Sequence, residues 1–169
     1  MEVLKSERWI TPISDVSALQ FHEANIFLWV IHANKIPPHL GISVGSKFYS
    51  LKANGKDDGI AVHKILPILS RKNIATVFYE IQKTAVCLSV EAVFAKFQAT
   101  VPGKVTCLEP LKTIFDCKNA AWLKELLSNL EDRGHIEKAL GWQLPEDFKG
   151  IPNYNPKDIH RRLEQLNNV

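Results

Sequence analysis

The chain has 169 residues, of which 46% are hydrophobic and 23% are charged. This length and composition predict one globular domain with a sizeable core, and they exclude a disordered protein. The formal charge of +3 is spread along the sequence, and no run of Lys and Arg is longer than the pair Arg161-Arg162. The chain therefore lacks the dense basic stripe typical of nucleic-acid-binding proteins, and we expect no nucleic-acid partner.

The N-terminal residues lack the pattern of a secretory signal, because Ser6-Glu7-Arg8 and Ser14-Asp15 interrupt every apolar run. The longest strongly apolar stretch, Ile26 to Ala33, is far shorter than the ~20 residues that a membrane helix needs. Three cysteines occur without close paired spacing, at Cys87, Cys107 and Cys117. This odd number is typical of free thiols in a reducing compartment. We therefore expect a cytoplasmic protein with no transmembrane segment.

The first half of the chain is rich in predicted strands. A loop and a short helix around 16–21 precede three apolar runs, at 26–31, 39–44 and 47–51, which we interpret as consecutive strands. Gly45-Ser46 indicates a two-residue hairpin turn, and the polar residues 54–59 indicate a loop. A short helix at 62–70 and a fourth strand at 74–79 follow.

The second half of the chain is predicted to be helical. Apolar residues recur at helical spacing in four segments, at 84–97, 108–115, 119–130 and 155–166. Strands followed by helices predict an α+β fold, with a small antiparallel sheet packed on a cysteine-bearing helix. We expect one domain over 1–169, with a core at about 24–118 and a helical C-terminal extension at about 119–169.

Cys107 is the first candidate for chemistry. Thr106-Cys107-Leu108-Glu109 fits a capping box, with Thr106 as the N-cap and Glu109 reaching back to it. This pattern predicts that Cys107 lies in the first turn of a helix, where backbone N–H groups favour a thiolate and can bind an oxyanion. A free cysteine that packs as a small hydrophobic residue is the alternative. Cys87 and Cys117, which lie inside helical patterns, are interpreted as core residues.

His39 is the second candidate. It follows Pro37-Pro38, so its backbone is expected to be extended, and alternation places its side chain on the same face as Gly41 and Ser43. Small neighbours leave room for a second side chain, as a general base requires. A structural or exposed histidine is the alternative.

No metal or cofactor site is predicted. His22, His63, His135 and His160 show no ligand spacing with one another or with the cysteines. Asp57-Asp58 is interpreted as an exposed acidic turn, although two adjacent carboxylates could bind a cation.

Together, the segment from His39 to Gly45, the run Phe48-Tyr49-Ser50-Leu51 and the segment around Cys107 resemble the permuted papain-like (NlpC/P60-type) superfamily. Its permuted members carry the histidine before the cysteine and include bacterial cysteine hydrolases and lecithin–retinol-acyltransferase-like lipid enzymes. The resemblance covers about 26–115. It implies a small sheet packed on the cysteine helix, a Cys–His pair, and amide or ester chemistry through a thioester.

The resemblance also implies a third polar residue after the histidine strand, usually His, Glu, Asn or Gln. Here that strand carries Ser50 and Lys52. We predict that Ser50 orients the imidazole, with Asn54 and Glu80 as alternatives.

The leading hypothesis is a cysteine hydrolase or acyltransferase that uses Cys107, His39 and Ser50 and no cofactor. Its substrate would be a peptide, an isopeptide or a lipid ester. The competing hypothesis is an inactive papain-like domain that serves as a binding module, with a partner surface at Trp142, Phe148 and Tyr154. The sequence leaves the oligomeric state open.

Overall fold

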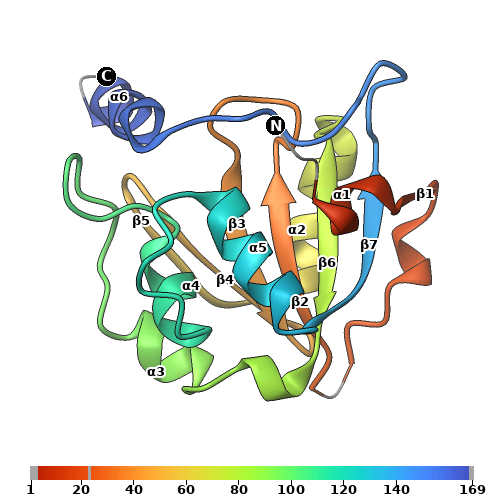
Figure 1. Cartoon of the computed structure of the whole chain (residues 1–169), viewed down its shortest axis with the longest axis horizontal. Coiled ribbons are helices and arrows are strands. Elements are labelled where there is room, and N and C mark those ends of the chain that lie inside the picture. The colour runs from red at the N-terminus through yellow and green to blue at the C-terminus, as the bar shows by residue number, and fades with distance from the viewer. Residues whose placement is uncertain (1–3, 23, 168–169) are drawn as a thin grey trace.

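A seven-stranded mixed sheet forms the centre of the computed structural model, which describes residues 4–22 and 24–167 (Figure 1). The strand order is β1-β7-β6-β2-β3-β4-β5; within the described residues, β1 and β7 pair in parallel and the other neighbours are antiparallel. The strands are β1 (Ile10–Ile13), β2 (Ile26–Ile31), β3 (His39–Val44), β4 (Lys47–Lys52), β5 (Gly55–Ala61), β6 (Thr76–Ile81) and β7 (Ile136–Trp142).

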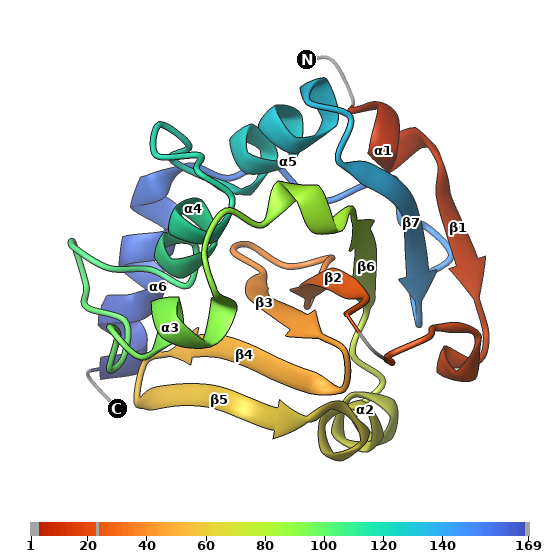
Figure 2. The ribbon, with the colours of Figure 1, turned by 90° about the horizontal axis from the view of Figure 1, so that it is seen from below.

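Helices cover both faces of this sheet. On one face lie α3, α4 and α5, while α2 lies on the other face and α6 lies at one end of the sheet (Figure 2). The helices are α1 (Lys5–Arg8), α2 (Val62–Arg71), α3 (Val90–Phe94), α4 (Glu109–Ile114), α5 (Leu123–Asp132) and α6 (Pro156–Asn167), with 3₁₀ turns at Val16–Ala18 and Lys83–Ala85. No helix in the described ranges is long and apolar enough to cross a membrane.

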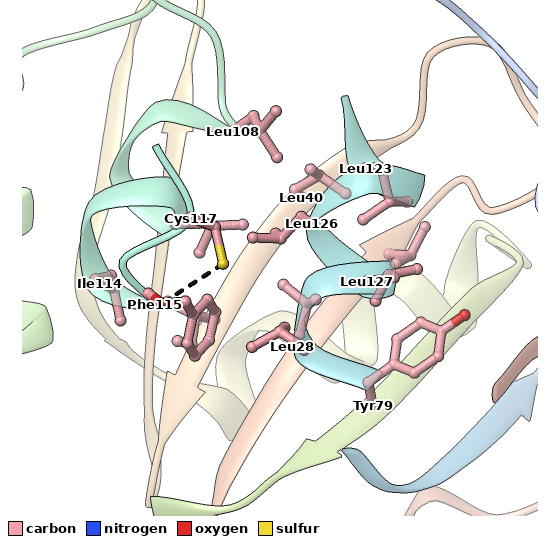
Figure 3. Close-up of a cluster of buried hydrophobic side chains, with 14 of the residues drawn as sticks. Leu28, Leu40, Tyr79, Leu108, Ile114, Phe115, Cys117, Leu123, Leu126 and Leu127 are labelled. Carbon is pink, nitrogen blue, oxygen red and sulfur yellow. Dashed lines mark hydrogen bonds between the residues drawn. The ribbon is translucent and has the colours of Figure 1, made fainter. Parts of the chain in front are cut away.

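The side chains of β2 alternate between two hydrophobic clusters. Leu28 and Val30 belong to the cluster beneath α4 and α5, whereas Phe27 and Trp29 belong to the cluster on the α2 face. Figure 3 shows the first cluster, in which leucines of α5 lie beside Leu28. All six residues of β2 are buried, so the sheet requires apolar cover on both faces.

The hairpin of β3 and β4 carries the predicted histidine segment. Gly45, with a φ of 57°, occupies the turn between these strands, as its sequence predicted. A Cβ on Gly41 would collide with the Phe48 ring, so this position has no room for a larger residue. The Trp29 indole donates a 2.9 Å hydrogen bond to the Ser43 hydroxyl, so the buried Ser43 on this face of β3 has a hydrogen-bond partner.

The structure confirms a mixed α and β chain, with the three consecutive strands, helix α2 and strand β6 close to their predicted places. The sheet, however, is larger than the small antiparallel sheet predicted. The C-terminal part is not wholly helical, because β7 pairs with both β6 and β1. Residues 55–61, predicted mostly as a loop, form strand β5.

The predicted helix at 84–97 is also wrong as one element. It is interrupted before α3, where the Ser89 hydroxyl accepts a 3.3 Å hydrogen bond from the Ala92 N–H and caps the short helix. The single-domain prediction over 1–169 includes residues 1–3, 23 and 168–169, which lie outside the described residues.

A buried carboxylate connects the N-terminal segment to the rest of the fold. The Glu7 side chain is 1% exposed, and its Oε2 lies 3.4 Å from the ammonium of Lys124 on α5. Its Oε1 accepts a 3.1 Å hydrogen bond from the Ile151 N–H. Glu7, Lys124 and Ile151, from three distant segments, therefore meet at one buried carboxylate, which water cannot easily reach to solvate.

Replacing Lys124 with Met should lower the free energy of unfolding by about 3 kcal/mol, because the Glu7 carboxylate would stay buried without its cation. Urea denaturation followed by circular dichroism measures this loss. Lys118→Met, at an exposed lysine, is the matched control and should change stability little. Equal stabilities of the two variants would contradict the role assigned to the ion pair.

Candidate functional site

A cavity of about 820 Å³ lies at the end of the sheet where β3 begins and β4 ends. The paired residues of these two strands stop at Gly41 and Ser50. Beyond this point the Lys52 carbonyl accepts a 2.9 Å hydrogen bond from the Thr100 N–H instead of one from β3. Both Cys107 and His39 line the cavity.

Cys107 lies in the turn that precedes α4 and not within the helix itself. The Thr106 hydroxyl accepts a 3.2 Å hydrogen bond from the Leu108 N–H within this turn. The N-cap residue of α4 is Leu108, however, so the prediction that Thr106 is the N-cap is wrong. The Glu109 carboxylate instead lies 3.6 Å from the Lys112 ammonium. The predicted cysteine-bearing helix is therefore replaced by a turn that leads into α4.

The Cys107 thiol is held in its neutral form. Burial raises its pKa from 9.0 to about 11, while the backbone N–H groups of Leu40 and of Cys107 itself favour the thiolate and oppose this shift. At neutral pH the sulfur is therefore a neutral thiol.

His39 is the first residue of β3 and is partly buried. Burial lowers its pKa from 6.5 to about 4; the Asp57 carboxylate acts in the opposite direction, whereas Lys52 and His32 lower the pKa further. Its imidazole is therefore uncharged at neutral pH, with a free nitrogen lone pair available as a base.

The two candidate groups approach the cavity from opposite faces of β3. Leu40 belongs to the cluster beneath α4, against which Cys107 also packs, and alternation along the strand turns His39 the other way. His39 is the first residue of β3, and it lines the cavity together with Cys107 at this end of the strand. In the part of the chain that the structure describes, no hydrogen bond joins the Cys107 thiol to the His39 imidazole.

Ser50 donates a 2.8 Å hydrogen bond to the Asp57 carboxylate, whose other oxygen lies 3.1 Å from the Lys52 ammonium. Ser50 pairs with Gly41, two positions along β3 from His39, or about 7 Å. Asp57 is thus the carboxylate whose negative charge favours the protonated form of His39, and Ser50 donates a hydrogen bond to this carboxylate. Asp57 was interpreted as part of an exposed turn, but its side chain is only 19% exposed on β5.

The alternative orienting residues lie in different places. Asn54 lines the cavity. Glu80 pairs with Phe27, four positions along β2 from the residue paired with His39, or about 13 Å, and its carboxylate lies 3.3 Å from the Lys138 ammonium. Glu80 therefore lies at the other end of the sheet from the cavity.

The other two cysteines do not line the cavity. Cys117 is buried, as predicted, whereas Cys87 is exposed and is not a core residue. In residues 4–22 and 24–167, no cluster of three or more His, Cys, Asp or Glu side chains is arranged to bind a metal ion.

The C-terminal segment supplies the cavity wall that the sequence did not indicate. Tyr154 is 6% exposed, and its hydroxyl accepts a 3.2 Å hydrogen bond from the Leu123 N–H. Ile159, Leu163 and Leu166 of α6 also line the cavity, and the Gly103 N–H donates a 2.9 Å hydrogen bond to His160 of this helix. Because Tyr154 and Trp142 are buried in the fold, the predicted aromatic partner surface is wrong.

No protein-family model, curated protein or solved structure matches this chain.

The free energy of unfolding of His39→Gln should depend less on pH between pH 8 and pH 4 than that of the native protein. The folded pKa lies below the unfolded pKa, so the stability that neutral His39 contributes is complete above pH 6.5 and is lost as pH falls toward 4. This loss amounts to about 3 kcal/mol in the native protein. Urea denaturation between pH 8 and pH 4 measures it, and His63→Gln, at an exposed histidine, is the control. Parallel curves for native and His39→Gln proteins would contradict the lowered pKa.

Alkylation by iodoacetamide should modify exposed Cys87 before Cys107 in the native protein. With a pKa of about 11, Cys107 should react about tenfold faster for each pH unit between 7 and 10, because only the thiolate attacks. Peptide mass spectrometry follows each cysteine separately. Rapid Cys107 labelling below pH 8 would instead indicate a thiolate already stabilised before substrate binds.

Proposed function

We propose that the chain is a cysteine hydrolase or acyltransferase of the permuted papain-like type, with Cys107 as the nucleophile and His39 as the general base. The observation that carries this proposal is that both residues line a single cavity large enough for a small acyl group. The order of the two residues in the chain and the hairpin that follows His39 agree with the resemblance described above.

The proposed reaction starts from a neutral thiol and a neutral imidazole. As the Cys107 sulfur attacks a substrate carbonyl, its proton passes to His39, and the new C–S bond leaves negative charge on the carbonyl oxygen. In this proposal the N–H groups of Leu40 and Cys107 would stabilise this charge. His39 then gives the proton to the departing amine or alcohol, which leaves a thioester. Water or a second acceptor cleaves the thioester and releases the thiol.

Asp57 would stabilise the imidazolium that forms during this transfer. It already opposes the lowering of the His39 pKa, and the hydrogen bond from Ser50 holds its carboxylate in place. In this proposal Ser50 is a positioning residue that acts through Asp57, and does not itself orient the imidazole. The substrate class stays a peptide, an isopeptide or a lipid ester.

The second candidate function is a papain-like domain that binds a ligand without turnover. The specific observation that favours it is the pair of opposed pKa shifts, which leave both groups uncharged at neutral pH. An activated cysteine usually has a lowered pKa next to a cationic imidazole. The two functions differ in whether an acyl group is ever attached to Cys107.

Acyl transfer from p-nitrophenyl esters of increasing chain length tests the proposal. We expect p-nitrophenol release and an acyl group on the Cys107 peptide by mass spectrometry. Cys107→Ala should abolish both, and His39→Gln should slow acylation by about 10²–10⁴-fold. Cys87→Ala, at an exposed cysteine, is the control and should retain activity.

Retained turnover in Cys107→Ala would overturn the proposal. Absence of acylation with every ester, in a folded protein, would favour the binding module. Asp57→Asn should slow acylation and Ser50→Ala should slow it less, because Ser50 acts only by holding Asp57.

A further inference from the structure

A second cavity, of about 350 Å³, adjoins the first at the turn after β2. His32 and Lys35 line both cavities. Lys72, at the end of α2, lines the smaller cavity, and Arg162, on α6, lines the larger one. These four residues, which we name the basic rim, come from three separate segments of the chain.

The basic rim has no acidic counterpart. Lys35, Lys72 and Arg162 are exposed and form no ion pair with any residue the structure describes. None of the described residues lining either cavity is Asp or Glu. Lys52, the remaining cation at the larger cavity, is already paired with Asp57. Besides burial, all three rim cations lower the pKa of His32, which indicates an uncompensated positive potential at this position.

The backbone that carries two of these cations is fixed. The Lys35 N–H donates a 2.9 Å hydrogen bond to the His32 carbonyl, which closes the turn after β2. On the facing side, the Gln143 amide donates two 3.0 Å hydrogen bonds, to the carbonyls of Leu69 and Ile74, on either side of Lys72. The fold therefore holds like charges near one another although their mutual repulsion opposes this arrangement.

We infer that the basic rim binds the phosphate group of a small phosphomonoester whose apolar part enters the Cys107 cavity. A phosphomonoester carries about −1.5 to −2 charges at pH 7 and three acceptor oxygens, which match several converging cations. Beside the rim, the larger cavity offers apolar side chains for the rest of the ligand, namely Ile36, Leu51, Ile159, Leu163 and Leu166. The inference concerns binding and is independent of whether Cys107 is catalytic.

Isothermal titration calorimetry with octyl phosphate at low ionic strength tests the inference. Octyl phosphate has no carbonyl for Cys107 to attack, so failure of the proposed acyl chemistry would leave this result unaffected. Lys35→Gln and Arg162→Gln should each weaken binding by about tenfold or more, the effect of losing one charged hydrogen-bond donor. Circular dichroism verifies that the variants fold.

Two variants serve as matched controls. Arg161→Gln removes the same charge from the adjacent position of α6, but Arg161 does not line the cavity, and its guanidinium lies 4.0 Å from Asp158. Lys47→Gln removes an exposed lysine from the opposite end of β4. Both should bind octyl phosphate as the native protein does.

Titrations with inorganic phosphate and with octanol distinguish the sources of affinity. Tighter binding of octyl phosphate than of inorganic phosphate supports the inference. Equal binding of the two, lost in Lys35→Gln and Arg162→Gln, supports the phosphate site but overturns the role of the apolar cavity. The inference is overturned altogether if octyl phosphate does not bind, if octanol binds equally well, or if the control variants weaken binding as much as the rim variants do.

Discussion

The burial of β2 on both faces is the constraint on which the rest of the structure depends. Every side chain of this strand belongs to one of two apolar clusters, one on each face of the sheet. Both faces must therefore be covered by other elements to exclude water from these clusters. The helices α4 and α5 meet this need on one side, and α2 meets it on the other. The register of β3 follows, because a shift of one residue would exchange Leu40 and Gly41 between tightly packed layers.

Local patterns predicted the elements whose own sequence carries their signal. The apolar runs at 26–31, 39–44 and 47–51 and the Gly45 turn correspond to β2, β3, β4 and the hairpin between the last two. Strand β7 was missed because Glu137, Lys138, Ala139 and Leu140 favour a helix, whereas pairing with β6 imposes an extended backbone. Strand β5 was missed although Asn54-Gly55 is a hairpin signal, because the following charged residues resemble a loop.

In the candidate site, too, some features follow from local sequence, whereas others depend on contacts between distant segments. His39 and Cys107 were chosen as candidates from local context, because prolines precede one and a threonine that bonds within the turn precedes the other. The contact between Asp57 and Ser50 depends on the pairing of β4 with β5, and the place of Tyr154 depends on packing of the chain against α5. Neither follows from spacing. The pKa directions of His39 and Cys107 also depend on burial, which no short motif specifies.

Different elements carry the candidate reactive groups and the cavity wall formed by α6. The sheet and the turn before α4 carry His39 and Cys107, whereas α6 contributes Ile159 and Leu163, which are its buried residues, to the core and the cavity. Substitutions at these two residues would change the cavity wall from α6, while His39 and Cys107 are carried by other elements. For the proposed chemistry, this division predicts that α6 can alter ligand selectivity while the candidate reactive groups stay the same.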